Sequence, residues 1–346
     1  MTSGVTALKQ NPIPSIDDYL GPGDQRFFGE GFKRGVHEVG EIVVGHDESG
    51  TGYVRGRASV AYPSDWSRKG ETDQRPHLST IDALVLGVQL SEVYLAHSRG
   101  LDERQRAGAW IRKARIKAGS SPVEEDLQGF DIQAVPAEVR PSPDGPDRLV
   151  TVLDSRIGTL TVRAEIDHPA GTPVSAPGTY ASLDAALGEG PQRPFGSGYK
   201  ARRQTIRDIE FTGEGDTART ASGVGFVTRE DAPVDGRGVE GRYHSSVSMI
   251  DSFVVGLQLG QVLLYELDGV SRANSNTLWM RQTVLEADSP LRPLDEVTTT
   301  SAHLADSMVL NTSKGETWRR ADIVGELGGI RLRASVAHQL PRDERA

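Results

Sequence analysis

The sequence predicts an α+β protein made of two copies of one module, each a curved antiparallel sheet wrapped around a single buried helix. Three observations predict this fold class. The chain repeats itself over nearly its whole length, each copy contains one long segment that is apolar on almost every side of a helix, and short segments typical of strands surround it.

The repeat is clearest near the start of each copy. SIDDYLGPGDQRFFGEGFK at 15–33 and SLDAALGEGPQRPFGSGYK at 182–200 share eleven identities in nineteen positions, at an offset of 167 residues. Later matches keep offsets of 169 or 170: Ser79-Thr-Ile-Asp82 with Ser248-Met-Ile-Asp251, Gly87-Val-Gln89-Leu90 with Gly256-Leu-Gln258-Leu259, Trp110-Ile-Arg112 with Trp279-Met-Arg281, and Ile157–His168 with Leu327–His338. A unit of roughly 165 residues has the size of a domain, so the chain is a domain duplication.

The repeat also predicts the domain boundaries. We expect a first module at 15–168 and a second at 180–340, with flexible ends at 1–14 and 341–346. The segment PAGTPVSAPGT at 169–179 is rich in proline and glycine, which is typical of a linker.

The elements follow in the same order in both copies. A serine cap at Ser15 or Ser182 starts a short helix, and a strand pair comes next, at 37–44 and 52–62 or at 205–212 and 220–228. After a polar loop and a long helix, the first copy has four further strand-like segments, at 109–118, 128–140, 148–155 and 158–168.

The long helices, at about 81–95 and 250–264, leave almost no polar face. Such a helix must be surrounded by the rest of its domain. A strand pair, a buried helix and a strand meander in this order are typical of the hotdog architecture, so the sequence predicts a tandem, or double, hotdog.

Composition excludes several classes of protein. No apolar run has the length of a membrane span, and no secretory signal opens the chain, so we expect a cytoplasmic protein that does not contact membranes. The absence of cysteine excludes thiolate metal sites, and no histidine spacing indicates a metal; we predict neither a metal nor a cofactor. A net charge of −9 argues against a nucleic-acid partner.

The segments SIDDYLGPGDQRFFGEGFKR, YPSDWSRK and RPHLSTIDALVLGVQL resemble the bacterial avirulence D (AvrD) family, and the resemblance covers nearly the whole chain. It implies a role in making syringolide-type signals, acyl-sugar lactones assembled from a β-ketoacyl chain and a sugar. The chemistry is similar to that of AfsA-type γ-butyrolactone synthases, which join a β-ketoacyl thioester to a three-carbon phosphate. The resemblance therefore implies a β-ketoacyl carrier protein or acyl-coenzyme A as donor and a small sugar or triose as acceptor.

A second resemblance is local. Ile81-Asp82-Ala83-Leu84 is similar to the start of the hotdog helix in β-hydroxyacyl thioester dehydratases, where the aspartate works with a histidine on the preceding loop. The loops at 63–76 and 230–242 contain no histidine, so the dehydratase motif is incomplete.

Four residues are candidates for catalysis. Asp82 and Asp251 begin the long helices three residues after a serine, where a carboxylate either completes a helix cap or acts as a general base. His77 and His244 lie just before the same helices, and each is either a solvated loop histidine or an acid–base group.

Eight further residues are candidates for substrate binding. The backbone N–H groups near Ser79 and Ser248, at the helix starts, are suited to stabilise an oxyanion. Gln89 and Gln258 follow the aspartates by seven residues, so they lie on the same side of the helix. Inside an apolar helix each glutamine side chain needs a hydrogen-bond partner, which is either the backbone or a substrate. Two tryptophan–arginine pairs share a strand face and either stack or bind an anion: Trp110 with Arg112, and Trp279 with Arg281.

The segment ERQRAGAWIRKARIK at 103–117 is a basic strip with no counterpart in the second copy. On an acidic chain it is either an ordinary solvated surface or a docking surface for an acidic carrier protein or a coenzyme A phosphate.

Taken together, the sequence predicts an acyltransferase that joins a β-ketoacyl thioester to a small sugar-like hydroxyl acceptor, acting as a monomeric pseudo-dimer or a homodimer. A dehydratase or thioesterase, and a non-catalytic acyl-ligand binding module, are the alternatives.

Overall fold

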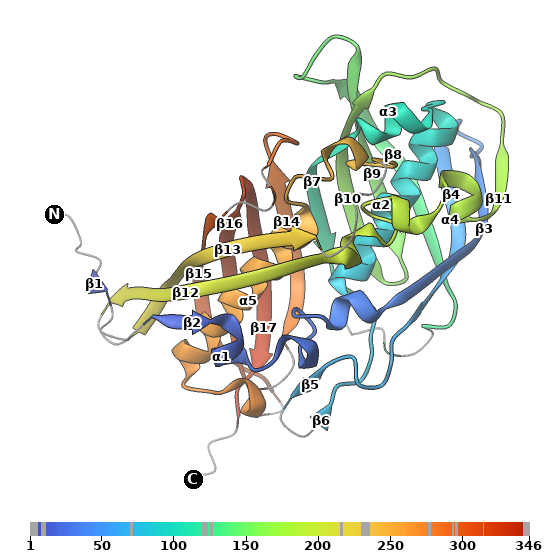
Figure 1. Cartoon of the computed structure of the whole chain (residues 1–346). Coiled ribbons are helices and arrows are strands. Elements are labelled where there is room, and N and C mark those ends of the chain that lie inside the picture. The colour runs from blue at the N-terminus through green and yellow to red at the C-terminus, as the bar shows by residue number, and fades with distance from the viewer. Residues whose placement is uncertain are drawn as a thin grey trace.

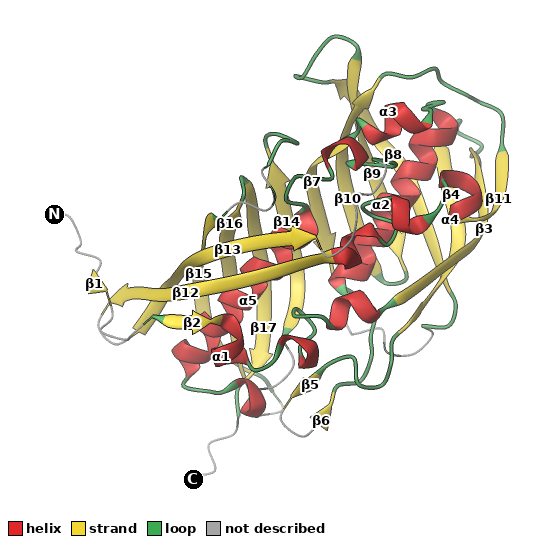
Figure 2. Ribbon diagram, viewed as in Figure 1, coloured by secondary structure: helices red, strands yellow, loops and turns green. Residues whose placement is uncertain are grey.

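The computed structural model describes residues 6–7, 12–69, 72–119, 124, 127–214, 217–229, 236–275, 278–292, 294, 297–313 and 315–341. The expected flexible ends, 1–14 and 341–346, lie largely outside these residues. Within them, 15 strands form one antiparallel sheet, and the helices are few (Figures 1 and 2). The predicted α+β class is confirmed at this level.

The sheet consists of two halves with the same strand order. The first half runs β7 (Trp110–Lys117), β10 (Leu160–Pro169), β9 (Arg148–Ile157), β8 (Phe130–Pro141), β4 (Gly52–Ala61) and β3 (Val36–His46). The second runs β14 (Trp279–Ala287), β17 (Ile330–Gln339), β16 (Thr317–Leu327), β15 (Thr298–Asn311), β13 (Thr217–Arg229) and β12 (Arg202–Glu214). Every strand segment predicted from the sequence is present.

One long helix lies inside each half. α2 (Thr80–Ser98) contacts the strands of the first half and α5 (Met249–Asp268) those of the second. Figure 1 shows β12 and β13 crossing in front of α5, with other strands of its half behind it. Almost every side chain of both helices is buried, as the apolar patterns predicted.

Glycines let the sheet approach α5 closely. A Cβ added to Gly256 would collide with Leu332, and one added to Gly260 would collide with Ile323. Gly260, with three atoms of the branched Ile323 side chain close by, has no room for a side chain, whereas Gly256 meets only a terminal methyl group of Leu332. The close approach at Gly260 explains why a long buried helix carries this weak helix former. α5 has the length and hydropathy of a membrane span, but 89% of that stretch is buried in the fold, so it is a core helix.

The two halves are related by an approximate twofold axis through the central strand pair. In the β7–β14 register Lys113 lies opposite Glu286, and Lys117 lies opposite Gln282. At the repeat offset of 169, Gln282 is the equivalent of Lys113 and Glu286 is the equivalent of Lys117, so the twofold rotation converts one pair into the other. Arg115 and Val284, equivalent to each other, lie opposite one another at the axis. The single chain thus has the arrangement of an isologous dimer.

The repeated N-terminal segments are exchanged between the halves. β2 (Ile13–Ser15) pairs with β12, and the helix that follows it, α1 (Ile16–Leu20), contacts α5. Reciprocally, β11 (Gly178–Ser182) pairs with β3, and α4 (Leu183–Leu187) contacts α2. In Figure 1 the blue segment accordingly lies on the orange half. The spatial unit around each helix therefore includes the other copy's first residues, and the expected linker ends in a strand.

The remaining elements are short. α3 (Glu103–Ala107) follows α2, and β5 (Arg68–Lys69) pairs with β6 (Thr72–Asp73) in a separate ribbon. Single 3₁₀ turns are η1 (Gly23–Gln25), η2 (Gly31–Arg34), η3 (Gly190–Gln192), η4 (Gly198–Ala201), η5 (Gly241–Tyr243) and η6 (Arg272–Asn274).

We predict that His168 makes the fold sensitive to acid. Its imidazole is fully buried, its Nδ1 lies 2.7 Å from the carbonyl oxygen of Pro169, and its Nε2 lies 2.7 Å from Thr151 Oγ1, so the neutral ring fits both partners. Burial lowers the pKa of His168 to about 4. Between pH 6.5 and 4 the unfolded chain binds the proton and the folded chain does not, so stability should fall with pH by up to about 3 kcal/mol.

This loss of stability is measured as the decrease in the midpoint of urea unfolding from pH 7 to pH 4.5. The His168→Gln variant should show a flatter profile, whereas a control substitution of the exposed His46 by glutamine should keep the wild-type slope. Parallel profiles for the wild type and His168→Gln would contradict the prediction.

Candidate functional site

A cavity of about 660 Å³ lies between the start of α2 and the strands of the second half. Its volume is that of a site for a small-molecule ligand. The start of α2 contributes Ser79 and Thr80, α5 contributes Gln261, and β14 contributes Trp279 and Arg281. The cavity is therefore formed by both copies.

Aromatic side chains make much of its wall: Phe27, Phe28, Trp66, Trp279 and Trp318. The rings of Phe27 and Trp66 meet edge to face with centroids 5.0 Å apart, and those of Trp279 and Trp318 do so at 6.2 Å. Such a wall suits the apolar chain of an acyl group.

The start of α2 carries a complete capping box. The Asp82 backbone N–H donates to Ser79 Oγ, at 3.1 Å, and the Ser79 backbone N–H donates to Asp82 Oδ2, at 2.8 Å. The reciprocal cap that was one of two interpretations of Asp82 is thus present. The other first-turn N–H groups, beginning with Thr80 on the cavity wall, have no acceptor within the helix.

Asp82 also belongs to a buried polar cluster behind the cavity wall. Its Oδ1 lies 2.7 Å from His37 Nε2 and accepts a 2.8 Å hydrogen bond from the Tyr62 hydroxyl. Burial raises the pKa of Asp82, but the bond and charge of His37 and the bonds from Ser79 outweigh it, so the net pKa lies below its ordinary value. Asp82 is therefore a buried carboxylate that orients His37.

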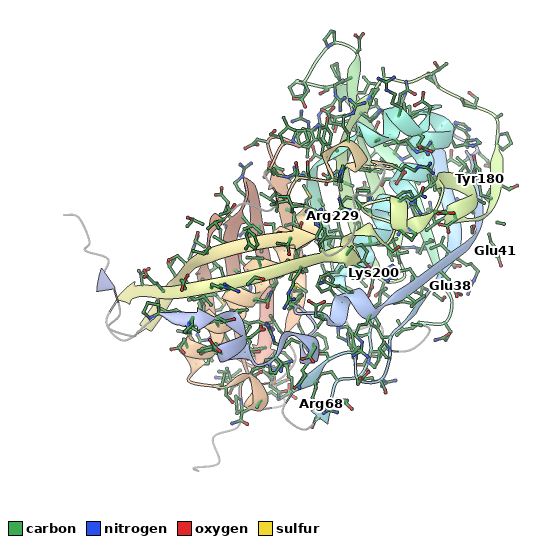
Figure 3. All side chains as sticks on the ribbon, viewed as in Figure 1. Glu38, Glu41, Arg68, Tyr180, Lys200 and Arg229 are labelled. Atoms are coloured by element: carbon green, nitrogen blue, oxygen red, sulfur yellow. The ribbon has the colours of Figure 1, made fainter. Side chains whose placement is uncertain are left out.

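The second copy contributes to the same cluster. Burial, with the charge of Asp82, raises the pKa of Tyr199, whose hydroxyl is buried and has no hydrogen-bond partner among the described residues. Lys200 donates a 2.5 Å hydrogen bond to the carbonyl oxygen of Gly35, at the start of β3, and Figure 3 shows it between the halves. The cluster thus depends on the exchange of segments.

Asp251, the equivalent of Asp82, has different partners. It keeps the capping box with Ser248, but its Oδ2 is bound to Arg202 Nη2 at 2.8 Å and its Oδ1 accepts from Gln204 at 2.7 Å. Gln204 stands where the first copy has His37, at the offset of 167. A guanidinium and an amide thus bind Asp251, whereas an imidazole and a phenol bind Asp82.

The two candidate histidines have unequal surroundings. His77 lines the cavity, its ring meets Trp66 edge to face at 5.2 Å, and its Nδ1 lies 3.3 Å from the carbonyl oxygen of Arg75. His244 lies beside a residual space of about 20 Å³, with its Nδ1 2.9 Å from the carbonyl oxygen of Gly241. Only His77 has room for a substrate next to it.

The candidate glutamines are buried and lie outside the cavity lining. Gln258 donates to the carbonyl oxygen of Val254 at 3.3 Å and accepts from Arg26 Nη1 at 2.5 Å. It thereby holds a cavity-lining arginine in place. Gln89 is buried at the equivalent position of α2.

The two tryptophan–arginine pairs have also diverged. The guanidinium of Arg112 stacks on Trp110 at 4.4 Å and is bound by Asp167 and Asp144, away from the cavity. Trp279 and Arg281 line the cavity. The stacking alternative thus holds for the first pair, and the second pair has the position that anion or substrate binding requires.

Ion pairs fill the region equivalent to the cavity on the other side of the axis. Glu92 lies 3.7 Å from Arg193 and 3.4 Å from Arg106, and Glu240 lies 3.3 Å from Arg292. The residual space there is lined by Phe195, Ser248 and His244, among others, and holds about one water molecule. Two equivalent sites have therefore become one open and one closed site.

The basic strip at 103–117 spans α3 and β7, and β7 lies at the centre of the sheet. Lys113 is 3.6 Å from Glu286, and Arg115 donates to Gln282 at 3.3 Å. Cross-strand partners thus take up part of its charge. Among the described residues no group of three or more histidine, aspartate and glutamate side chains is arranged to hold a metal ion.

Five residues of the site were not among those indicated by the sequence: His37, Tyr62, Tyr199, Lys200 and Arg26. A signal for His37 existed, since the aligned strands carry histidine in one copy and glutamine in the other. The rest required knowing which segments meet in space.

We predict unequal costs for removing the two equivalent carboxylates. Asp251→Asn leaves Arg202 buried without its carboxylate, which should cost roughly 3–5 kcal/mol, whereas Asp82→Asn keeps acceptors for its partners and should cost about 1–2 kcal/mol. Urea unfolding followed by tryptophan fluorescence measures both. Asp154→Asn, in an exposed pair with Arg163, is the control, and equal losses at Asp82 and Asp251 would contradict the prediction.

Comparisons with known proteins give low-identity structural neighbours and one family. The tesB protein of Mycobacterium avium subs paratuberculosis is 8% identical over 83% of this chain and 93% of its own, with a TM-score of 0.40. The acyl-CoA thioesterase II TesB2 of Mycobacterium marinum is 12% identical over 84% and 94%, with a TM-score of 0.36. The dehydratase domain from the CurJ module of curacin polyketide synthase is 11% identical over 86% and 94%, with a TM-score of 0.34.

No curated protein matches the chain. A family model described as Pseudomonas avirulence D protein (AvrD) matches residues 12–341, which is nearly the whole sequence and agrees with the resemblance of its motifs. The chain belongs to the AvrD family.

Proposed function

We propose that this protein is a double-hotdog enzyme that transfers a β-ketoacyl group from a thioester to the hydroxyl of a small sugar-like acceptor, giving the precursor of a lactone or butenolide signal. The observation that carries the proposal is the cavity between the halves, where a helix start, a histidine and an aromatic wall meet. Membership of the AvrD family supports the choice of acyl-sugar chemistry.

The cavity supplies what the reaction needs. The acyl chain lies against the aromatic wall, and the thioester carbonyl points at the first-turn N–H groups of α2 near Thr80. These donors and the positive end of the helix stabilise the negative oxygen that develops during attack.

His77 is the group in position for proton transfer. It takes the proton of the acceptor hydroxyl as the oxygen bonds to the carbonyl carbon, and it returns the proton to the sulfur when the carbon–sulfur bond breaks. The products are an ester and a free thiol, so no oxidant or reductant is needed.

The other candidates have supporting roles in this proposal. Asp82 and His37 form a positioning pair behind Ser79, and Trp279 and Arg281 complete the far wall of the cavity. Asp251, His244 and Ser248 belong to the closed site, where ion pairs leave no space for a substrate. The active half is thus the one that carries α2.

The donor, in this proposal, is a carrier-protein or coenzyme A thioester, and the enzyme acts in the cytoplasm as a single-chain pseudo-dimer. One chain suffices because both walls of the cavity come from it.

The experiment is mass spectrometry of the protein incubated with a β-ketoacyl thioester and acceptors including xylulose and dihydroxyacetone phosphate. We expect a new ester or lactone mass and thiol release that depends on the acceptor. His77→Gln should lower the rate at least about 100-fold, the usual contribution of an acid–base group, and His244→Gln should leave it unchanged.

Circular dichroism of both variants controls for folding. Thiol release without an acceptor would identify a thioesterase, and an unreacted lipid that copurifies with the protein, with no turnover, would identify a binding module. Equal rates for the wild type and His77→Gln would overturn the role of His77.

A further inference from the structure

Three cationic side chains line one wall of the cavity: Arg26, Lys69 and Arg272. Arg26 follows the short turn η1, Lys69 lies on β5, and Arg272 lies on η6 of the second copy. Arg68, labelled in Figure 3, marks the ribbon that carries Lys69. Segments far apart in sequence thus bring positive charge to one place.

Main-chain contacts hold this cluster together. Arg272 Nη2 donates to the carbonyl oxygens of Gln25, at 3.2 Å, and Arg68, at 2.5 Å, which are the residues next to Arg26 and Lys69. Lys69 Nζ donates to Ser275 Oγ at 3.2 Å. Burial, and to a smaller extent the charge of Arg272, lower the pKa of Lys69 to about 8.

The carboxylates in the cavity wall are committed to other arginines. Among the described lining residues these are Asp73, bound by Arg68 at 2.8 Å, and Glu124, bound by Arg75 at 2.9 Å. The charged or titratable neighbours of Arg272 among the described residues are Tyr265 and Arg26, with no carboxylate. Arg272 therefore brings positive charge that no described carboxylate offsets.

Arg26 is the most enclosed of the three cations. Its side chain is 4% exposed, it binds Asp17 and Gln258, and its Nε is buried with no hydrogen-bond partner among the described residues. Arg26 therefore contributes charge to this wall, partly offset by Asp17, and no free donor.

The closed half contains the same arginine with one more carboxylate beside it, because Arg26 pairs with Asp17 and Arg193 pairs with the equivalent Asp184, at 3.5 Å. Arg193, the equivalent of Arg26, faces Glu92 at 3.7 Å. The equivalent of Glu92 at the offset of 169 is Gln261, which lines the cavity one turn from Gln258. The open half thus has a neutral amide where the closed half has a carboxylate, which removes the charge that would compete with an anion.

From these observations we infer that Arg26, Lys69 and Arg272 form a subsite for the phosphate group of a substrate. Three neighbouring cations on one cavity favour a dianion over a singly charged carboxylate, and guanidinium groups bind phosphate oxygens through paired donors. The subsite lies in the proposed active site, so the statement that its ligand is a substrate rests on the proposed function. The phosphate belongs either to the acceptor, as in a sugar phosphate, or to the donor, as in a phosphopantetheine arm.

The test measures binding alone at pH 7, by quenching of the fluorescence of the cavity tryptophans and by calorimetry. The probes are matched pairs: xylulose with xylulose 5-phosphate, dihydroxyacetone with its phosphate, and pantetheine with 4′-phosphopantetheine. In at least one pair the phosphorylated member should bind at least about tenfold more tightly, as expected for charge-assisted hydrogen bonds, and the pair that shows the preference identifies the source.

Two kinds of variant should remove this preference. Lys69→Met and Arg272→Gln each delete a cation, and Gln261→Glu introduces the carboxylate that faces the equivalent arginine in the closed half. Each should bring the two members of the pair to within about threefold, with little change for the unphosphorylated member. Arg163→Gln, an exposed residue on β10, matches the change in net charge and should keep the preference.

Equal affinity within every pair for the wild type, or a preference that survives in all three folded variants, would overturn the subsite. Failure of the proposed function is distinguishable from this result. A phosphate preference without acyl transfer keeps the subsite and rejects the reaction, and acyl transfer without the preference does the reverse.

Discussion

The pairing of β7 with β14 is the interaction on which the rest of the structure depends. It joins the two halves edge to edge and sets the register in which Arg115 meets Val284 at the pseudo-twofold axis. Because of this register, the start of α2 faces strands of the second half across the cavity. The cavity is thus a consequence of sheet pairing, and neither copy contains a complete site by itself.

The two sites that this symmetry creates differ in the charges that line them. Buried ion pairs such as Glu92–Arg193 add little net stability, because desolvation offsets most of their attraction, but they fix one arrangement of the groups they join. The closed site thereby provides a rigid frame for the open one.

Local sequence patterns were sufficient for the repeat, the long helices, the strands and the helix caps, because each depends on residues close together in the chain. The contacts of Asp82 illustrate the limit. Its cap with Ser79 spans three residues and was one of the two interpretations of the sequence, whereas its bond to His37 spans 45 residues and depends on how β3 lies against α2. The exchange of the N-terminal segments was beyond any local pattern, since either pairing satisfies the same apolar residues.

That exchange bears on the origin of the chain. If a single ancestral module had the same topology, its first strand and short helix could find their places only on a second identical chain, so the ancestor was an interlocked homodimer. Fusion of two such genes would have preserved every contact and freed each copy to accumulate its own substitutions. A homodimer must keep its two sites identical, whereas the fused chain holds His37 in one copy and Gln204 in the other. The duplication thus made it feasible for one half to specialise as scaffold and the other as site.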